Sequence, residues 1–258
     1  MNYVEPERAK TLGGLRLVLT AGVPGPWSQA AKSIFDVKGI AYTPVVQHGG
    51  MPNEELVAWT GHRNAPIAVY EQERPRTGWG EILLLAERLA PEPALVPSDP
   101  EQRALMFGLS HEICDEQGFG WNRRLTFLHD ILSRPDSSSF ERAVAETLGT
   151  SYGYGPKQGA RANGRVVEVL GLLARQLRAQ QAAGSRYLVG QRLSAADIYW
   201  ACFAALVDPL PPAVNPMPDM IRAWYQKKDP VVAAAVDPML LRHRDHIYQH
   251  HLKLPLEF

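Results

Sequence analysis

The 258-residue chain has only two cysteines, no excess of either charge and no long apolar segment. Lysine and arginine together number 27, as do aspartate and glutamate, so the formal net charge is zero. Nucleic acids and anionic membrane surfaces bind basic proteins, and a neutral chain therefore argues against both as partners. No apolar run reaches the ~20 residues that a membrane-spanning helix needs.

The sequence also lacks an internal repeat and a low-complexity tract. Its first ten residues carry acids and no apolar centre, which argues against a secretory leader. The two cysteines, Cys114 and Cys202, stand in apolar helical stretches, and we expect a reduced, cytoplasmic protein. A hydrophobic content of 45% with 21% charged residues is typical of a globular chain.

The strongest local signal lies in residues 190–206, GQRLSAADIYWACFAAL. Ser194 and Asp197 form a capping box, in which each side chain can satisfy a free backbone N–H at a helix start. Leu193 and Ile198 have the spacing of a hydrophobic staple around that start. The residues that follow are apolar on every face, and such a helix is normally buried by other helices. We expect this segment to be the central helix of a mostly helical domain.

The first part of the chain alternates strands and helices. Residues 15–20 (LRLVLT) predict a strand, and a helix begins at Pro26, because proline suits the first helical position. This helix ends at Lys38 and Gly39, and residues 40–46 predict the next strand. Strand, helix and strand at this spacing form a βαβ unit.

Three further elements and a linker follow. Residues 54–59 predict a short helix, residues 64–70 a strand with proline at its entry, and residues 79–89 a strongly apolar helix. Charge and proline lie between residues 70 and 77, where the fourth strand of a clean hairpin would be expected. The proline-rich residues 91–98 are the expected linker.

These phrases resemble the glutathione transferase superfamily. The capping box and its lead-in, Tyr187–Gly190, match the family's buried helix. Lys38–Ile40 matches the end of the family's first helix, and Ala65-Pro66 matches its Val-Pro pair. The resemblance does not fix the class, and bacterial members are the expected relatives.

The resemblance implies an α/β plus all-α architecture. Residues 1–90 would form an N-terminal thioredoxin-like, glutathione-binding domain, with residues 1–13 as an N-terminal extension. Residues 91–98 would be the linker, and residues 99–258 an all-helical glutathione-transferase C-terminal domain with the hydrophobic-substrate site. Members of the family are usually dimeric, so a homodimer is expected.

The resemblance also implies a glutathione site in the first domain. In the family, the proline matched by Pro66 is cis, and the residue before it, here Ala65, presents its backbone to the cysteine of glutathione. Asn64 stands where the family often has Gln or Lys, and Glu81 matches the acid that binds the γ-glutamyl end. The serine that should follow this acid is Ile82 here, which cannot form a hydrogen bond.

Glutathione chemistry needs a thiolate, and the family supplies a Ser, Cys or Tyr donor near the start of its first helix. One register places Gly25, which has no side chain, at that position, and another places Trp27 and Ser28 on the family's Cys-Ser phrase. We expect Ser28 to be the catalytic residue and Trp27 to be a wall of the glutathione site. Thr20 and the backbone N–H groups of the first helical turn are alternative donors. Ser28 could equally be an ordinary first-turn serine that satisfies a free N–H.

The rest of the chain is expected to be helical, starting with a long helix over residues 99–132 that is interrupted within residues 118–120. In the family this helix faces the active site. Phe107, His111 and Trp121 are therefore the expected residues of the electrophile site. Any one of these aromatic side chains is more often a core residue than a binding residue.

Later segments carry weaker signals. Residues 151–163 are rich in Gly and Tyr and predict a loop, whereas residues 165–181 and 220–228 predict helices. The histidines near the end of the sequence have helical spacing, but without a set of carboxylates or cysteines they are typical of a solvated face, and we predict no metal site. These histidines are His243, His246, His250 and His251.

The leading hypothesis is a glutathione transferase-like enzyme that uses glutathione as cosubstrate and activates its thiol for attack on a small apolar electrophile. Glutathione-dependent isomerases, dehalogenases and ether-cleaving enzymes share this architecture, so the fold does not choose the reaction. A non-catalytic binding module is the other alternative, because Gly25 and Ile82 occupy positions of functional side chains. A peroxidase or reductase is disfavoured, since neither Cys114 nor Cys202 lies near the first helix start.

Overall fold

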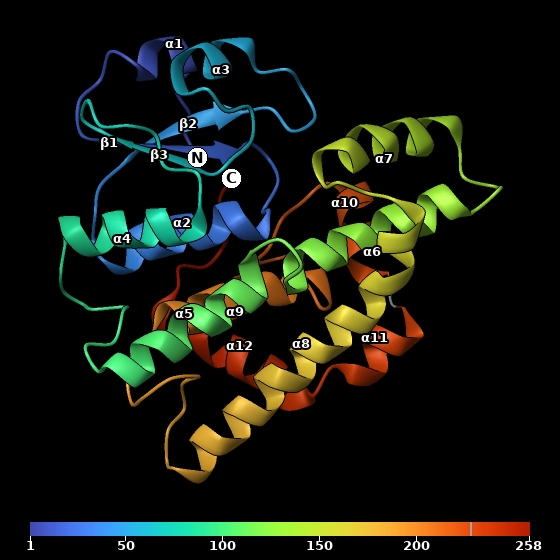
Figure 1. The fold of residues 1–258 in the computed structure, drawn as a ribbon. Helices are drawn as coiled ribbons and strands as arrows, with labels where there is room; N and C mark the ends of the chain where they lie inside the picture. The colour runs from blue at the N-terminus through green and yellow to red at the C-terminus, as the bar shows by residue number, and fades with distance from the viewer. Residues whose placement is uncertain (228) are drawn as a thin grey trace.

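The structure, a computed structural model, describes residues 1–227 and 229–258. Within these ranges a three-stranded sheet lies at one end of the molecule, and a larger group of helices lies next to it (Figure 1). The strands β1 (Leu15–Thr20), β2 (Thr43–Gln47) and β3 (Ile67–Tyr70) stand in the order β2-β1-β3. β1 pairs in parallel with β2 and antiparallel with β3, so the predicted βαβ unit is present.

Helices cover both faces of this sheet. α2 (Pro26–Val37) and α4 (Trp79–Leu89) lie on one face, and α1 (Pro6–Ala9) and α3 (Glu54–Thr60) lie on the other (Figure 1). Side chains of a strand point alternately to the two faces, and the central strand therefore feeds two separate cores. Leu15, Leu17 and Leu19 enter the core shared with α2 and α4, and Val18 enters the core shared with α1 and α3.

The second strand starts later than the sequence predicts. β2 begins at Thr43 and not at residue 40, because the turn that ends α2 takes up the residues before it. Gly39 has a φ of 65°, and the Ile40 N–H donates to the Phe35 carbonyl at 2.9 Å. Ile40 is thus tied to the helix end and not to the sheet.

The segment after β3 forms one bridge in place of a fourth strand. The backbones of Ala68 and Arg76 exchange two hydrogen bonds, each 2.9 Å long. Pro75, the residue before Arg76, has no N–H with which to continue a ladder. Charge and proline in this segment therefore limit the pairing to a single bridge.

The N-terminal residues cover the outer edge of β2. The Val4 N–H donates to the Pro44 carbonyl at 3.0 Å, and the Val46 N–H donates to the Val4 carbonyl at 3.1 Å. An exposed strand edge is a template for pairing with another chain. Val4 occupies this edge over the middle of β2.

Among the remaining helices α9 lies near the centre of the group, and α5 and α12 pack against it, as does α2 (Figure 1). No helix of the described chain is long and apolar enough to cross a membrane. In chain order these elements are α5 (Pro100–Cys114), α6 (Phe119–Ser133), α7 (Ser139–Ser151), α8 (Pro156–Ala182), α9 (Ala195–Phe203), the 3-10 turn η1 (Ala204–Leu206), α10 (Asp219–Gln226), α11 (Pro230–Ala235) and α12 (Pro238–His251).

The start of α9 confirms the predicted capping box. The backbone N–H and the hydroxyl of Ser194 both donate to Oδ2 of Asp197, at 2.9 and 2.7 Å. The other carboxylate oxygen of Asp197 accepts from the Leu188 N–H at 2.7 Å and lies 2.9 Å from Nε2 of His243. His243 is only 5% exposed, so the prediction of a solvated histidine face is wrong for this residue.

The predicted long helix is interrupted as expected. α5 ends at Cys114 and α6 begins at Phe119. Gly118 makes the turn between them sterically feasible, because a Cβ at this position would lie 2.7 Å from the Glu112 carbonyl oxygen.

Two predictions for the region after α6 are wrong. α7 was not predicted from the sequence, and α8 begins at Pro156, inside the segment expected to be a loop. Pro156 occupies the first helical position of α8. The expected helix over residues 220–228 is observed as α10, which spans Asp219–Gln226, and its last expected residue, Lys228, lies outside the described residues.

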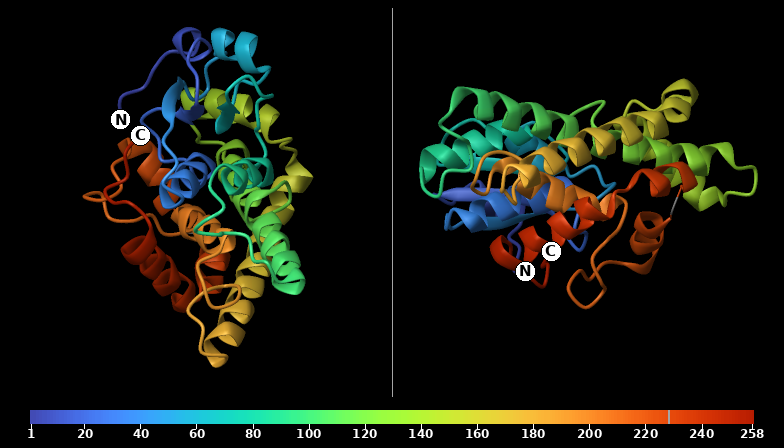
Figure 2. Two further views of the ribbon diagram at one scale, coloured as in Figure 1. Left: turned by 90° about the vertical axis from the view of Figure 1, so that its left-hand side faces the viewer. Right: turned by 90° about the horizontal axis from the view of Figure 1, so that it is seen from below.

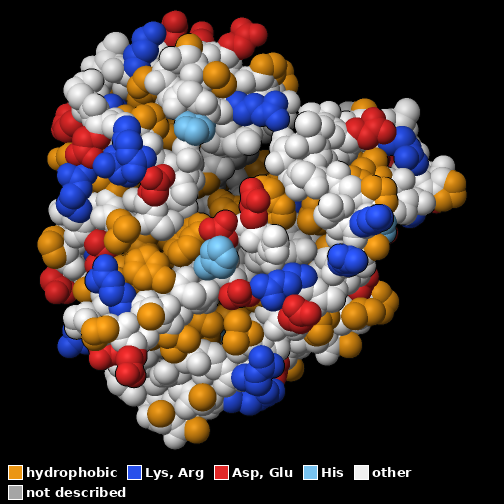
Figure 3. Space-filling model, viewed as in Figure 1, with side chains coloured by type: hydrophobic (Ala, Val, Ile, Leu, Met, Phe, Trp, Pro, Cys, Tyr) orange, Lys and Arg blue, Asp and Glu red, His pale blue; other side chains and the backbone are white. Residues whose placement is uncertain are grey.

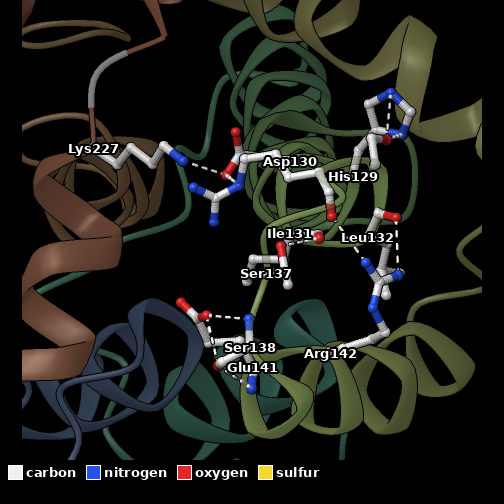
Figure 4. Close-up of polar contacts among 11 residues, drawn as sticks. His129, Asp130, Ile131, Leu132, Ser137, Ser138, Glu141, Arg142 and Lys227 are labelled. Carbon is white, nitrogen blue, oxygen red and sulfur yellow. Dashed lines mark hydrogen bonds and ion pairs between the residues drawn. The ribbon is translucent and has the colours of Figure 1, made fainter.

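Polar contacts fix the turn between α6 and α7 (Figure 4). The Ser137 hydroxyl donates to the Ile131 carbonyl at 2.6 Å, and the Arg142 guanidinium donates to the Leu132 carbonyl at 3.2 Å. Ser138 and Glu141 form a capping box at the start of α7. These bonds hold α7 as a hairpin arm against α6.

Residues after α12 return to the sheet-bearing part of the molecule, so that both ends of the chain lie close together (Figure 2). The Lys253 ammonium pairs with the Asp36 carboxylate of α2 at 3.0 Å. The Lys32 ammonium, also from α2, lies 5.6 Å from the centroid of the Phe258 ring.

Candidate functional site

A small pocket, with a cavity volume of about 20 Å³, lies where the sheet-bearing part meets the helices, and it is partly open to solvent. The face drawn in Figure 3 is hollowed at this junction, with apolar side chains at the edge of the hollow. The residues that line the pocket come from α2, the cis-proline turn, α4, α5 and α9. They are Trp27, Ala30, Ala31, Ile34, Pro66, Thr77, Trp79, Ile82, Cys114, Tyr199 and Phe203.

One side face of α2 lines this pocket, beginning at Trp27, and the first turn of the helix has free backbone donors. Gly25 is the N-cap and offers no side chain, and Pro26 is the first helical residue. The first helical bond runs from the Gln29 N–H to the Gly25 carbonyl at 2.8 Å. The N–H groups of Trp27 and Ser28 therefore have no acceptor among the described residues. Such a helix start carries partial positive charge and favours an anion.

The hydroxyl candidates differ in their surroundings. Ser28 is 2% exposed, and its hydroxyl has no hydrogen-bond partner among the described residues. It lies in the first turn of α2 but is not among the residues that line the pocket. The Thr20 hydroxyl donates to Oε1 of Gln47 at 2.8 Å and is thus already engaged. Of the two hydroxyls, only that of Ser28 is free to donate.

Trp27 connects the two parts of the molecule. Its Nε1 donates to the Cys114 carbonyl at the end of α5, at 2.8 Å. Its ring packs edge-on against Phe203 of α9, with 4.8 Å between centroids. Gly120 of α6 allows this approach, because a Cβ there would lie 3.1 Å from Trp27 and 2.3 Å from Phe203. Trp27 is therefore both a wall of the pocket and an anchor between its two sides.

The proline turn has the expected geometry. The Ala65-Pro66 peptide bond is cis, and Pro66 lines the pocket. The Ala65 N–H and carbonyl form no hydrogen bond among the described residues, so both remain available to a ligand. Asn64, the preceding residue, is exposed.

Glu81 caps the start of α4 and pairs with an arginine. Its Oε1 accepts from the Arg74 guanidinium at 2.7 Å. This hydrogen bond, helped by the N–H groups of Gly78 and Thr77, holds the pKa of Glu81 below its ordinary value despite desolvation. An incoming ammonium group would share the carboxylate with Arg74. Ile82, in place of the family's serine, is 1% exposed and forms part of the pocket wall.

Phe107 and His111 of α5 lie beside Trp79 at the edge of the pocket. The Phe107 and Trp79 ring centroids are 6.3 Å apart. His111 Nδ1 lies 3.2 Å from Oδ2 of Asp115, and Trp79 Nε1 donates to the same oxygen at 3.0 Å. Although desolvation opposes it, these partners lower the pKa of Asp115.

Trp121 of α6 belongs to a different group. Its Nε1 donates to the Tyr152 carbonyl at 3.1 Å, and the two rings pack edge-on at 4.8 Å. Tyr152 lies 6.5 Å from Trp27. The structure therefore does not bring Phe107, His111 and Trp121 together, and none of the three lines the pocket itself.

Several pocket residues were not predicted from the sequence. Tyr199 and Phe203, four residues apart on α9, were interpreted only as core, although this spacing places both on one face of the helix. The Tyr199 hydroxyl donates to the Trp79 carbonyl at 3.1 Å. Cys114 also lines the pocket, and burial raises the pKa of its thiol well above the usual range.

The described residues contain no group of three or more His, Cys, Asp or Glu side chains suited to a metal ion. His246 and His250 of α12 have ring centroids 4.2 Å apart, and the Tyr187 hydroxyl lies 3.1 Å from Nε2 of His251. These contacts lie away from the pocket residues.

Residues 156–227, from the start of α8 to just beyond α10, match the family model of the glutathione S-transferase C-terminal domain. The chain has the glutathione transferase fold. The resemblance to this superfamily is thus confirmed, as is the predicted fold class of a thioredoxin-like part followed by a helical part.

Solved structures with this fold cover almost the whole chain. A glutathione S-transferase from Methylobacterium radiotolerans, in complex with glutathione sulfonate, is 15% identical with a TM-score of 0.61, over 92% of this chain and 91% of the other. The β-etherase LigF from Sphingobium sp. strain SYK-6 is 17% identical with a TM-score of 0.62, over 91% and 95%. Ure2p in complex with glutathione is 13% identical with a TM-score of 0.62, over 93% and 91%.

The TM-scores of these structures show the glutathione transferase fold, whereas sequence identities this low show no specific activity. A search of curated protein sequences gave no match.

Proposed function

We propose that the chain is a glutathione-dependent transferase that activates the thiol of glutathione for attack on a small apolar electrophile. One observation carries this proposal. Trp27, in the first turn of α2 with its free N–H groups, and the cis-proline Pro66 line the same apolar pocket between the two parts of the chain. Structural neighbours in complex with glutathione or its sulfonate support the choice of ligand.

In this proposal the sheet-bearing part binds the peptide. The free N–H and carbonyl of Ala65 pair with the cysteinyl unit, and Pro66 and Trp27 form the walls around it. Asn64, which is exposed beside this turn, contacts the tripeptide. Glu81 binds the γ-glutamyl ammonium, and the N–H groups at the start of α4 bind the γ-glutamyl carboxylate.

The thiolate lies at the start of α2. A free thiol has a pKa near 8.5, and a helix N-terminus or a hydrogen-bond donor lowers it. The Trp27 and Ser28 N–H groups and the Ser28 hydroxyl donate to the sulfur, and the proton leaves to solvent. The thiolate then forms a bond to the electrophilic carbon, and the leaving group departs with the electron pair of the bond that breaks.

The apolar electrophile binds beyond the sulfur, where Trp27, Phe203 and Tyr199 line the pocket. Phe107 and His111 lie at one edge of this region and Trp121 at the other, and we propose that they limit the size of the electrophile.

A non-catalytic module of the same fold is the alternative. Gly25 at the N-cap and the buried Ile82 leave two positions without the side chains that the family uses. Ether cleavage is a further reaction compatible with the fold, since the β-etherase LigF is among its neighbours. Both alternatives keep glutathione as the ligand and differ only in turnover.

We further propose that residues 1–90, with residues 1–13 as an extension, form the glutathione-binding domain, residues 91–98 the linker and residues 99–258 the helical domain. We also propose a cytoplasmic homodimer. Leu84 of α4 and Leu105 of α5 are 47% and 39% exposed, and such apolar side chains on neighbouring helices suit a symmetric interface. Light scattering of the wild type and of Leu84→Glu tests this assembly, and a monomeric wild type would contradict it.

Capture on immobilised glutathione, followed by conjugation with 1-chloro-2,4-dinitrobenzene, tests the transferase. We expect binding and turnover, and a roughly 10- to 100-fold lower kcat/KM in Ser28→Ala, because one hydrogen bond to a thiolate is lost. Ser33→Ala is the matched control, since Ser33 is a buried serine on the same helix whose hydroxyl accepts from Gln29. Binding without turnover would favour the module, and unchanged turnover in Ser28→Ala would leave thiolate stabilisation to the backbone N–H groups.

A further inference from the structure

Arg124 of α6 lies against the pocket wall on the side of Trp27. Its guanidinium carbon is 6.0 Å from the centroid of the Trp27 ring and 5.2 Å from that of Tyr225. One of its nitrogens donates to the Tyr225 hydroxyl at 2.8 Å. Arg124 stays charged at any ordinary pH, so a permanent cation lies next to the pocket.

This cation has no carboxylate partner among the described residues. Its polar neighbours are the phenol oxygens of Tyr225 and Tyr152. Its Nε is buried and has no hydrogen-bond partner there. A buried N–H of a charged group without an acceptor is costly, and such a group is satisfied when a water molecule, an ion or a ligand binds beside it.

The neighbouring arginine shows the contrast. Arg123 points into the helical core, where its Nε and Nη2 donate to the Leu206 carbonyl at 3.1 and 3.0 Å. Its Nη1 donates to the Thr126 hydroxyl at 3.0 Å. All three nitrogens of Arg123 therefore have structural partners, whereas Arg124 keeps donor capacity unused.

The helical spacing places Arg124 on the face of α6 that packs on Trp27. Gly120 and Arg124 are one turn apart on α6 and share one face of it. A Cβ on Gly120 would touch Trp27, so this face of α6 packs on the indole that lines the pocket. Arg124 is partly exposed, and the rings of Trp27 and Tyr152 lie near its side chain.

We propose that Arg124 selects electrophiles that carry an anionic group, a carboxylate or sulfonate, on an aromatic ring. A guanidinium binds these groups through two parallel hydrogen bonds. The Trp27 and Tyr152 rings, 6.5 Å apart, supply aromatic surface next to it. This inference rests on the proposed transferase function, because it describes the second substrate of that same pocket.

Equilibrium binding tests the inference without turnover. Calorimetry compares 4-nitrobenzoate with methyl 4-nitrobenzoate, which has the same ring but no charge. We expect the wild type to bind the acid more tightly than the ester, and Arg124→Gln to lower the affinity for the acid about 10- to 100-fold while leaving the ester unchanged. Arg134→Gln removes an equal charge from the other end of α6, where Arg134 pairs with Asp130, and should change neither affinity.

Steady-state kinetics show whether the anionic group that binds Arg124 belongs to the electrophile or to glutathione. With 4-chloro-3,5-dinitrobenzoate and its methyl ester as electrophiles, Arg124→Gln should lower kcat/KM only for the acid, and Arg124→Lys should restore part of it. A changed KM for glutathione with equal rates for acid and ester would place a glutathione carboxylate at Arg124 and overturn the inference.

The remaining outcomes are also decisive. A wild type that binds the ester as tightly as the acid overturns the inference, even if Arg124→Gln does not fold. Preferential binding of the acid without any conjugation sustains the anion site and rejects the transferase function instead.

Discussion

Gly120 lies where three helices meet at the pocket, and replacing it with alanine is a direct test of the packing. An added Cβ would lie 2.3 Å from Cε1 and 2.6 Å from Cδ1 of Phe203, and 3.1 Å from Cζ2 of Trp27. Phe203 is fully buried in α9, and the Trp27 indole is held by its bond to the Cys114 carbonyl. Neither ring can move away without disturbing other contacts.

The expected magnitude follows from two opposing effects. Overpacking a well-filled core costs roughly 1–3 kcal/mol. Alanine is favoured over glycine within a helix by up to about 1 kcal/mol, and this gain is smaller near a helix start such as Gly120. We therefore expect Gly120→Ala to lower the free energy of unfolding by about 1–2 kcal/mol. It should also lower kcat/KM, because Trp27 and Phe203 both line the pocket.

Urea unfolding followed by circular dichroism at 222 nm measures the stability. Gly108→Ala is the matched control, because Gly108 is an exposed helical glycine of α5 with no atom within 4 Å of an added Cβ. This control should gain roughly 0.5–1 kcal/mol from the same chemical change. If Gly120→Ala unfolds at the same or a higher urea concentration than the wild type, the close approach of α6, α9 and Trp27 is not as described.

Three further outcomes follow from buried polar groups. Lys38→Met should lower the free energy of unfolding in urea by about 3 kcal/mol. The Lys38 ammonium lies 2.7 Å from the Glu87 carboxylate in a part-buried pair, and the substitution leaves this carboxylate without its partner. An unchanged unfolding midpoint would contradict this. Asp197→Asn should lower the free energy of unfolding by a comparable amount, because it removes a fully buried carboxylate that accepts hydrogen bonds from the Leu188 N–H and from the N–H and hydroxyl of Ser194. A Tm equal to that of the wild type in thermal unfolding would show that this carboxylate does not stabilise the fold. Burial raises the pKa of Cys202 to about 12 and that of Cys114 well above its usual range, so both thiols stay protonated at pH 8. Both should therefore resist a thiol reagent at pH 8 until urea is added. Fast labelling of the native protein would show that they are exposed.

The central helix and the cap that starts it could be predicted from the sequence because the signals are local. Ser194 and Asp197 are three residues apart, and the helix after them is apolar on every face, so that it must be buried. The cis bond at Pro66 could be expected only from the resemblance, since no spacing rule specifies the isomer.

The hairpin arm of α7 was missed although a local signal was present. Ser138 and Glu141 have the spacing of a capping box, and Val144 and Leu148 follow them at helical spacing. The start of α8 was taken for a loop because of its glycines. Gly159 has a packing reason: a Cβ there would lie 2.6 Å from Nδ1 of His129, so the glycine lets α8 approach α6 closely.

The contacts that shape the site join residues far apart in the sequence and could not be predicted. Trp27 bonds to Cys114, 87 positions away, and the Arg63 guanidinium donates to the Ser151 hydroxyl across 88 positions. Arg124 could not be predicted as a site residue either, because an arginine in an amphipathic helix is usually exposed to solvent. Only the packing of α6 on Trp27 shows that Arg124 lies beside an indole that lines the pocket.

The return of residues 252–258 to α2 restricts how the pocket can open. Residues 91–98 form the first connection between the sheet-bearing part and the helices, and residues 252–258 form a second one. The Lys253–Asp36 ion pair and the contact between Phe258 and Lys32 hold this second connection in place. A hinge rotation about one linker would break these ties. We therefore expect small rotamer changes of the aromatic side chains at the mouth, and not a rotation of one half against the other, to admit substrates.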